Sequence, residues 1–147
     1  ERFDLTYVSE DGSKKRPVMV HRALFGSLER FIGIITEHYA GAFPTWLAPV
    51  QVRVIPVNMN FHHAYCEELK KLLLDNGIRV EEDYRDEKLG YKIRESQTAK
   101  VPYTLVIGDN EVANNLVTYR KHGTQAQVTV SVAEFVNLIL EHNKNHN

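Results

Sequence analysis

The sequence predicts an α/β fold, a mixed five-stranded sheet with flanking helices that follows an antiparallel hairpin and one helix. Three observations support this fold. Apolar and polar residues alternate on both sides of Asp11-Gly12, which is typical of a hairpin. From residue 50 onward the pattern runs strand, helix, strand, helix, strand, which favours a parallel sheet. Two further short strands surround Gly123, and we expect them to extend that sheet as a hairpin.

The first region holds the hairpin and one helix, and we expect it to form a domain at residues 1–43. The alternating apolar residues of the hairpin are Phe3, Leu5, Tyr7, Val18 and Val20. The helix is expected to open at Gly26 and close at Gly41, because apolar residues recur between them at helical spacing. These residues are Leu28, Phe31, Ile32, Ile35 and Tyr39. A lone hairpin with one helix buries little apolar surface, so we interpret this region as the edge of a larger sheet domain.

The second region starts at the proline-bounded segment 44–49, and we expect its domain to span residues 44–147. Residues 50–57 form a nearly continuous apolar run, which is typical of a buried strand. Further strands are predicted from residue 78 onward and over 101–107.

Two helices are predicted between these strands. The first, over 61–76, carries its apolar residues on one face and ends before Gly77, which is placed to cap it. That apolar face consists of Tyr65, Leu69, Leu72 and Leu73. The second helix, over 87–98, is expected to bury only Leu89 and Ile93.

The last part of the chain predicts the hairpin and a final helix. The hairpin strands are expected over 116–120 and 126–130. Ser131 and Glu134 have the spacing of a capping box, which marks the start of the helix. Residues 142–147 carry no pattern, and we expect this tail to be frayed.

Composition excludes several classes of function. Lys and Arg total 18 and Asp and Glu total 19, so the net charge is −1 and a broadly basic nucleic-acid tail is excluded. The apolar share of 43% and the charged share of 25% are those of a soluble domain with a core. No apolar run approaches the roughly 18–20 residues that span a bilayer, so we expect no membrane partner. The chain begins without Met, and we interpret it as part of a longer protein.

The cysteine and histidine residues show no metal-ligand pattern. Cys66 is the single cysteine, which excludes an internal disulfide, suggests a reducing compartment and predicts a partly buried apolar role. Four histidines lack supporting carboxylates or thiols and are expected at the surface: His62, His63, His142 and His146.

The first candidate site is the predicted helix start at Gly26-Ser27, with Arg30 in the first turn. The amino end of a helix presents unpaired N–H groups and a positive dipole end, which suit phosphate, and an arginine there can pair with phosphate oxygens. The alternative is a turn with a surface ion pair. His21, at the end of the preceding strand, is either a ligand or a hydrogen-bonded strand histidine.

The second candidate site is the segment 84–100. Its five basic residues against three acidic residues give it a net charge of +2. On a helical wheel, four residues share the solvated face opposite the apolar pair: Lys88, Tyr91, Lys92 and Glu95. Basic and aromatic groups on one face suit single-stranded nucleic acid. The alternative is an ordinary charged helix in solvent, and Arg120, after Tyr119 at a strand end, has the same two interpretations.

Several phrases of the sequence resemble the carboxy-terminal part of the threonyl-tRNA synthetases, a family of class II aminoacyl-tRNA synthetases. They are Pro17-Val-Met-Val-His-Arg-Ala, Gly26-Ser-Leu-Glu-Arg-Phe-Ile-Gly, Phe43-Pro-Thr-Trp-Leu-Ala-Pro-Val-Gln-Val, Gly77-Ile-Arg-Val, Glu87-Lys-Leu-Gly-Tyr-Lys-Ile-Arg-Glu and Val101-Pro-Tyr. These phrases stand in the family's order and cover almost the whole chain. The first are specific to the threonyl family, and the later ones are shared in outline with the prolyl, histidyl and glycyl families.

The resemblance implies that residues 1–43 are the end of a class II catalytic domain, closed by motif 3. Arg30 would be the motif 3 arginine that holds the ATP phosphates and stabilises charge during adenylate formation. Ser27 would lie in the same nucleotide-binding turn, and Mg would accompany the ATP. His21 would be one of three zinc ligands, and the zinc would bind the amino and hydroxyl groups of threonine. A site that pairs a substrate hydroxyl rejects an isosteric analogue without one, such as valine.

The resemblance further implies that residues 44–147 are a class II anticodon-binding domain whose partner is threonine tRNA. It assigns anticodon contacts to five residues: Asp86, Lys88, Lys100, Glu111 and Arg120. Glu111 and Arg120 would pair with base edges, while Lys88 and Lys100 would meet phosphates or bases. Asp86 stands where the family usually has Asn, and Lys100 where it often has Arg.

The family's motif 1, motif 2, other two zinc ligands and editing region have no counterpart in this sequence. We therefore expect a cytoplasmic, homodimeric parent enzyme that ligates threonine to its tRNA with ATP, and no activity from this part alone. The alternative is a free-standing module, similar to an anticodon-binding domain, that binds RNA or a protein without catalysis. A third interpretation is an α/β small-ligand domain, which predicts a pocket at the carboxyl ends of the parallel strands and no affinity for RNA.

Overall fold

The computed structural model describes residues 4–23 and 25–146 of the chain. The chain divides into two compact units, Glu1–Ile34 and Ile35–Asn147. Among the described residues, no helix combines the length and the apolar character that crossing a bilayer requires.

The first unit contains the predicted hairpin. Strands β1 (Tyr7–Val8) and β2 (Lys14–Lys15) pair antiparallel around Gly12, whose φ of 76° is the left-handed conformation that glycine adopts without strain. The hairpin is confirmed, but its strands are shorter than predicted. Val18 and Val20 lie beyond β2 and are 90% and 84% exposed, because no described strand pairs with that stretch. Phe3, the other end of the predicted pattern, lies outside the described residues.

Helix α1 (Leu28–His38) occupies the segment between Gly26 and Gly41, as predicted. Both glycines have positive φ, 68° and 75°, which marks the turns at the two ends of the segment. The apolar spacing of α1 does not produce a core, since none of its residues is buried.

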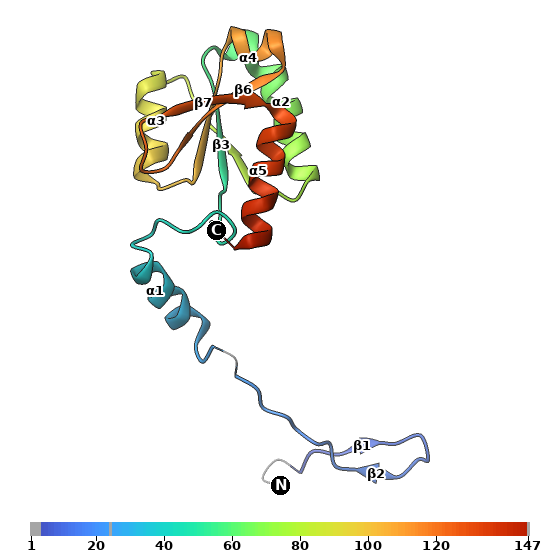
Figure 1. Ribbon diagram of the computed structural model, residues 1–147. Coiled ribbons are helices and arrows are strands. Elements are labelled where there is room, and N and C mark those ends of the chain that lie inside the picture. Colours follow the sequence, from blue (N-terminus) through green and yellow to red (C-terminus); the bar gives the residue numbers. More distant parts are fainter. Residues whose placement is uncertain (1–3, 24, 147) are drawn as a thin grey trace. The chain divides into compact units, whose positions relative to one another are not determined.

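The second unit is built on a sheet with the strand order β4-β3-β5-β6-β7 (Figure 1). The strands are β3 (Val52–Pro56), β4 (Val80–Glu82), β5 (Tyr103–Ile107), β6 (Leu116–Lys121) and β7 (Gln127–Ser131). Strands β4 and β5 pair parallel with β3, whereas β6 and β7 continue the sheet antiparallel. This is the mixed five-stranded sheet that the sequence predicts.

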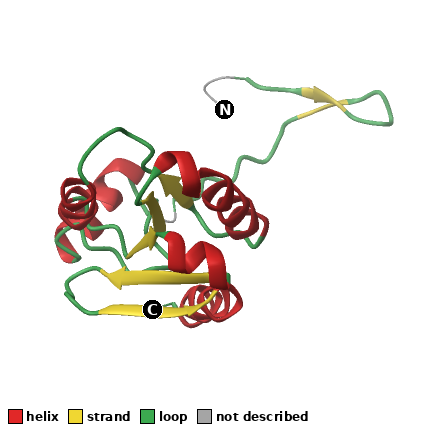
Figure 2. Cartoon of the chain, turned by 90° about the horizontal axis from the view of Figure 1, so that it is seen from above, coloured by secondary structure: helices red, strands yellow, loops and turns green. Residues whose placement is uncertain are grey.

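Helices cover both faces of this sheet (Figure 2). One face packs against α2 (Met59–Asp75) and α5 (Val132–Asn145), and its core joins Leu105 of β5 to Leu73 and Phe135 of the two helices. The other face packs against α3 (Leu89–Thr98), where the buried hydroxyls of Ser96 and Thr104 lie 2.6 Å apart. The short helix α4 (Asp109–Asn114) follows β5.

The helices differ from the expectations in three ways. Leu72, predicted on the buried face of α2, is 43% exposed, because the helix buries the narrower stripe of Cys66, Leu69 and Leu73 together with His62. The prediction of a frayed tail is wrong for residues 142–145, since α5 runs to Asn145, and Asn147 lies outside the described residues. Helix α4 was not predicted, because six residues without a buried side chain give no apolar period.

Three local predictions are confirmed: the glycine that ends α2, the capping box of α5 and the buried position of Cys66. Gly77 follows the end of α2 with a φ of 73°, and Ser131 with Glu134 forms the capping box of α5. Cys66 is fully buried, and burial raises the pKa of its thiol to about 12. The thiol is therefore neutral and part of the core.

Candidate functional site

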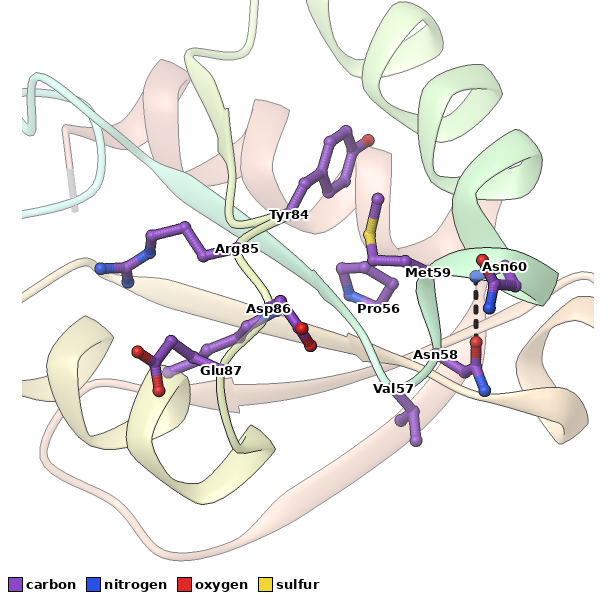
Figure 3. Close-up of a pocket in the computed structure, with 10 residues that line it drawn as sticks. Pro56, Val57, Asn58, Met59, Asn60, Tyr84, Arg85, Asp86 and Glu87 are labelled. Atoms are coloured by element: carbon purple, nitrogen blue, oxygen red, sulfur yellow. Dashed lines mark hydrogen bonds between the residues drawn. The ribbon is translucent and has the colours of Figure 1, made fainter.

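A pocket of about 580 Å³ opens where the parallel strands β3 and β4 end (Figure 3). One wall is the start of α2, where the Asn58 side chain accepts a hydrogen bond from the Asn60 backbone N–H at 2.9 Å, the dashed line in Figure 3. The opposite wall is the loop between β4 and α3. The lining residues are Pro56, Val57, Asn58, Met59, Asn60, Tyr84, Arg85, Asp86, Glu87 and Lys92. Amide, carboxylate and ammonium groups thus stand beside apolar side chains, a mixture that is typical of ligand-binding pockets.

Arg85 is directed away from the helix start (Figure 3), because carboxylates hold it. Its guanidinium bonds to Asp83 at 2.7 Å and to Glu95 at 2.5 Å. The hydrogen bond from Arg85 is the main cause of the lowered pKa of the Asp83 carboxyl. Arg85 therefore links the loop to α3. Because two carboxylates pair with its guanidinium, it adds little uncompensated positive charge to the surface.

Lys92 is not on the solvated face where the helical wheel places it. Its side chain is 3% exposed and its ammonium donates to the backbone carbonyl of Asp83 at 3.2 Å. The buried face of α3 is Lys92 and Ser96, whereas Leu89 and Ile93 are half-buried. The helical wheel misplaces Lys92 because α3 packs on polar groups of the sheet and the loop. The inner face of the helix is therefore polar. The exposed basic surface of this helix is correspondingly smaller than predicted.

Glu111 is held at the start of α4, where its side chain reaches β6. One carboxylate oxygen accepts from the Gly108 backbone N–H at 2.9 Å and the other from the Thr118 hydroxyl at 2.7 Å. Burial opposes ionisation of Glu111, but these hydrogen bonds outweigh it and lower its pKa. An ionised carboxylate has about four acceptor positions, so Glu111 can still accept from a ligand.

A polar ladder continues from Glu111 across the α3 face of the sheet; we use this name for Thr104, Thr118, Arg120, Gln127 and Thr129. Thr118 donates to Glu111, so the 2.7 Å contact between the Thr118 and Thr129 hydroxyls requires Thr129 to donate. Arg120 stands two residues further along β6 on the same face, paired with Thr104 and Gln127. The ladder is buried at Thr104 and exposed at Gln127 and Thr129, so it opens toward the edge strand β7.

The structure brings together some of the predicted anticodon contacts. Asp86, Lys88 and Glu111 follow the parallel strands β4 and β5, and therefore lie at the same edge of the sheet. Asp86 lines the pocket, and Lys88 is the exposed N-cap residue of α3. Arg120 lies on the adjoining ladder.

Lys100 is not with the others. It precedes β5 and so lies at the amino ends of the parallel strands, the opposite edge of the sheet. Its ammonium donates to the backbone carbonyl of Ala40, and its side chain lies beside Gly41. In this conformation Lys100 ties the segment after α1 to the end of α3.

The candidate nucleotide site in the first unit has the expected helix start. The Ser27 hydroxyl donates to Glu29 at 2.7 Å and accepts from the Arg30 backbone N–H at 3.4 Å, and the first of these bonds lowers the pKa of Glu29. The Arg30 side chain is exposed, as is His21. Within residues 4–23 and 25–146, no group of three His, Cys, Asp or Glu side chains is placed to hold a metal ion. His21 therefore has no set of partner ligands in the described part of the chain.

The expectation that His62 and His142 lie at the surface is wrong. His62 is 3% exposed, and its ring bonds to the Asn58 backbone N–H at 3.1 Å and to Asp109 at 2.9 Å. His142 lies half-buried on α5, with its Nδ1 3.1 Å from the Tyr103 hydroxyl. Their structural roles were missed because the partners are distant in sequence. For His62 one local signal existed, since it lies four residues after the N-cap Asn58 and so on the first turn of α2.

Comparison with protein families gives two matches. Residues 51–142 match the anticodon-binding domain family, and residues 1–39 match the class II core domain family of the tRNA synthetases for glycine, histidine, proline, serine and threonine. Among curated relatives, the threonine–tRNA ligase of Acetivibrio thermocellus is 56% identical over 145 residues, 99% of this chain and 23% of that protein. The threonine–tRNA ligase of Lactobacillus gasseri is 57% identical over 136 residues, 92% of this chain and 21% of that protein. The chain thus spans about a fifth of the length of these relatives.

Comparison with solved structures agrees. The crystal structure of the RNA-binding domain of threonyl-tRNA synthetase from Cryptosporidium parvum matches with a TM-score of 0.74 and 34% identity, over 95% of this chain and 35% of that chain. Prolyl-tRNA synthetase from Cryptosporidium parvum matches with a TM-score of 0.61 and 21% identity, over 69% of this chain and 23% of that chain. The second match shows a shared fold.

Proposed function

The chain belongs to the anticodon-binding domain family, and from this premise we propose that it recognises the anticodon stem-loop of threonine tRNA within a threonine–tRNA ligase. The observation that carries this proposal is identity above 50% to threonine–tRNA ligases over nearly the whole chain. In this proposal residues 44–147 form the anticodon-binding domain, and residues 1–43 belong to the catalytic domain of the longer protein.

The anticodon contacts are proposed at the carboxyl edge of the sheet and the adjoining polar ladder. Glu111 supplies an ionised acceptor for base N–H groups, and Arg120 supplies donors for base acceptors. Asp86 adds an acceptor in the lining of the pocket, and Lys88 adds an exposed cation for phosphate. Lys100 reaches RNA in this proposal only by leaving its bond to Ala40. An unpaired loop suits such a site, because its bases are free to turn into pockets and toward base-reading side chains.

The proposed chemistry of the longer protein is ATP-dependent attachment of threonine to its tRNA. Arg30 and Ser27 are assigned to ATP, with Arg30 neutralising phosphate charge while the adenylate forms and Mg bound with the nucleotide. The support is the match of residues 1–39 to the class II core domain and the exposed Arg30 at the start of α1. This part of the chain is not expected to act alone.

The zinc ion that the family resemblance implies does not fit the described residues by themselves. His21 is one candidate ligand without the further two that a three-ligand site requires, so no step is derived through the metal. We propose that His21 contributes to zinc only together with ligands elsewhere in the longer protein. A homodimer and a cytoplasmic location are likewise proposals for that protein, the latter in keeping with the free, buried Cys66.

The experiment that tests the proposal is binding of the full 147-residue chain to an anticodon stem-loop of threonine tRNA. A loop with a substituted anticodon is the control, and both are titrated across a salt series. Tighter binding of the threonine loop at every salt concentration is expected, because base contacts are less sensitive to salt than phosphate contacts. Equal affinity and equal salt slopes for the two loops would contradict base recognition. No binding even at low salt would favour the small-ligand interpretation, which the pocket at the strand ends also fits.

A further inference from the structure

We infer that His62 and Asp109 are positioning residues for the base-reading carboxylate Glu111, an inference that rests on the proposed function. His62 lies on α2 and Asp109 is the first residue of α4, and their side chains lie 2.9 Å apart. Neither residue is among the anticodon contacts that the resemblance implies. Their bond joins the first turn of α2 to the start of α4.

The protonation state of the His62 ring follows from its two partners. The Asn58 backbone N–H can only donate, so Nδ1 of His62, at 3.1 Å, accepts and carries no proton. Nε2 therefore carries the proton and donates to the Asp109 carboxylate. A neutral ring with one fixed tautomer makes a directional link between the start of α2 and the start of α4.

Helix α4 is held in place by the packing of Val112 against the core and by such links. It has six residues, none of them buried, and a helix of that length is marginal in isolation. The Val57 backbone N–H donates to the Ile107 carbonyl at 2.9 Å, and this bond joins the segments where β3 and β5 end. The bond from His62 to Asp109 extends that tie into the helix itself, two residues before Glu111.

The position of Glu111 depends on the same turn. Its carboxylate accepts from the Gly108 N–H and the Thr118 hydroxyl, and both bonds require the first turn of α4 to remain where it is. The Asp109 side chain is 97% exposed and that of His62 is 4% exposed. Asp109 can therefore be changed without disturbing the core, whereas His62 cannot.

The test measures base discrimination, the ratio of the dissociation constants of a base-substituted loop and the threonine anticodon loop. Asp109→Ala, made in the full chain, is expected to lower this ratio by about three- to tenfold, because a mobile Glu111 favours the correct base less. Asp109→Asn retains an oxygen that accepts from Nε2, so it is expected to restore the ratio. Asp75→Ala, at the far end of α2, makes the same charge change and is expected to leave the ratio unchanged.

Two further measurements make the test decisive. Nitrogen NMR of the histidine rings is expected to show a neutral His62 with its proton on Nε2, protected from exchange in the original chain and in Asp109→Asn. A charged ring, or a proton on Nδ1, would overturn the inference.

Glu111→Gln distinguishes the positioning role of His62 and Asp109 from the base-reading role of Glu111. If it lowers discrimination while Asp109→Ala does not, the positioning role is wrong and the reader role of Glu111 stands. If Glu111→Gln also leaves discrimination intact, the reader role fails and the inference fails with it.

Discussion

Lys92 donates a hydrogen bond from its buried ammonium to the backbone carbonyl of Asp83, and this bond holds the loop that carries Asp86 against α3. The hydrogen bond from Arg85 is the largest cause of the lowered pKa of the Asp83 carboxyl. The positive charge of Lys92 makes a smaller contribution in the same direction. Lys92, which the helical wheel placed on the solvated face of α3, is thus an internal support of the pocket.

Lys92→Met is expected to lower the free energy of unfolding by about 1–3 kcal/mol, because it keeps the aliphatic stem but leaves the buried Asp83 carbonyl without a partner. Urea unfolding measures this difference. Lys88→Met is the matched control, since Lys88 is exposed and has no side-chain capping bond. It is expected to change stability by less than about 0.5 kcal/mol while weakening RNA binding. Equal stabilities of the two variants would contradict the supporting role of Lys92.

Arg120→Ala is expected to weaken binding of the threonine anticodon loop by roughly 1–3 kcal/mol if Arg120 makes a bidentate base contact. Lys121→Ala is its control, because successive residues of a strand point to opposite faces and Lys121 leaves the polar ladder unchanged. The control is expected to reduce the salt slope at most. An unchanged dissociation constant for Arg120→Ala, measured by fluorescence anisotropy, would return Arg120 to a structural role.

The fold could be predicted where its causes are local. The capping box at Ser131, the glycine after α2 and the apolar strand β3 are each specified by neighbours in the chain, and all three are confirmed. Contacts that depend on the assembled sheet could not be predicted in this way. Helical periodicity assumes an apolar interior, so it misplaced Lys92, whose inner partner is a backbone carbonyl.

In the candidate site too, some positions follow from the order of the strands, whereas others depend on the assembled fold. Asp86 and Glu111 could be brought to one edge of the sheet by the rule that parallel strands end together. Lys100 could be assigned only by resemblance, and its bond to Ala40 depends on the course of the segment that follows α1. His62 belongs to no metal-ligand pattern in the sequence and was therefore expected at the surface. In the structure its ring hydrogen-bonds at the starts of α2 and α4.

Arg30→Ala, made in the longer protein that we propose is a threonine–tRNA ligase, is expected to depress adenylate formation while leaving tRNA affinity nearly intact. The physical reason is that Arg30 is an exposed cation at a helix start, and in the proposed role it would stabilise phosphate charge that develops during the reaction. Pyrophosphate exchange measures the adenylate step, and filter binding measures tRNA affinity. An equal loss of both would indicate that the substitution disturbs the structure and would count against the assigned role.

The attachment of α5 is expected to weaken in mild acid because of His142. Burial, followed by the charge of Lys121, lowers the pKa of the His142 ring, and its Nδ1 lies 3.1 Å from the Tyr103 hydroxyl. The folded state therefore takes up this proton at a lower pH than the unfolded chain, whose histidine has a pKa of about 6.5. The stabilising contribution is complete above that value and is lost as the pH falls through the lowered pKa of the folded state.

Thermal unfolding of the chain between pH 8 and pH 5 measures this effect, with the midpoint expected to decline below about pH 6.5. His142→Gln provides the comparison, because glutamine can accept from Tyr103 but does not titrate in this range. Its midpoint is expected to vary less with pH over the same interval. His63→Gln, on the exposed face of α2, is expected to retain the full decline of the original chain. If His142→Gln and His63→Gln decline in parallel, the acid sensitivity arises from other groups and the coupling of His142 to folding is wrong.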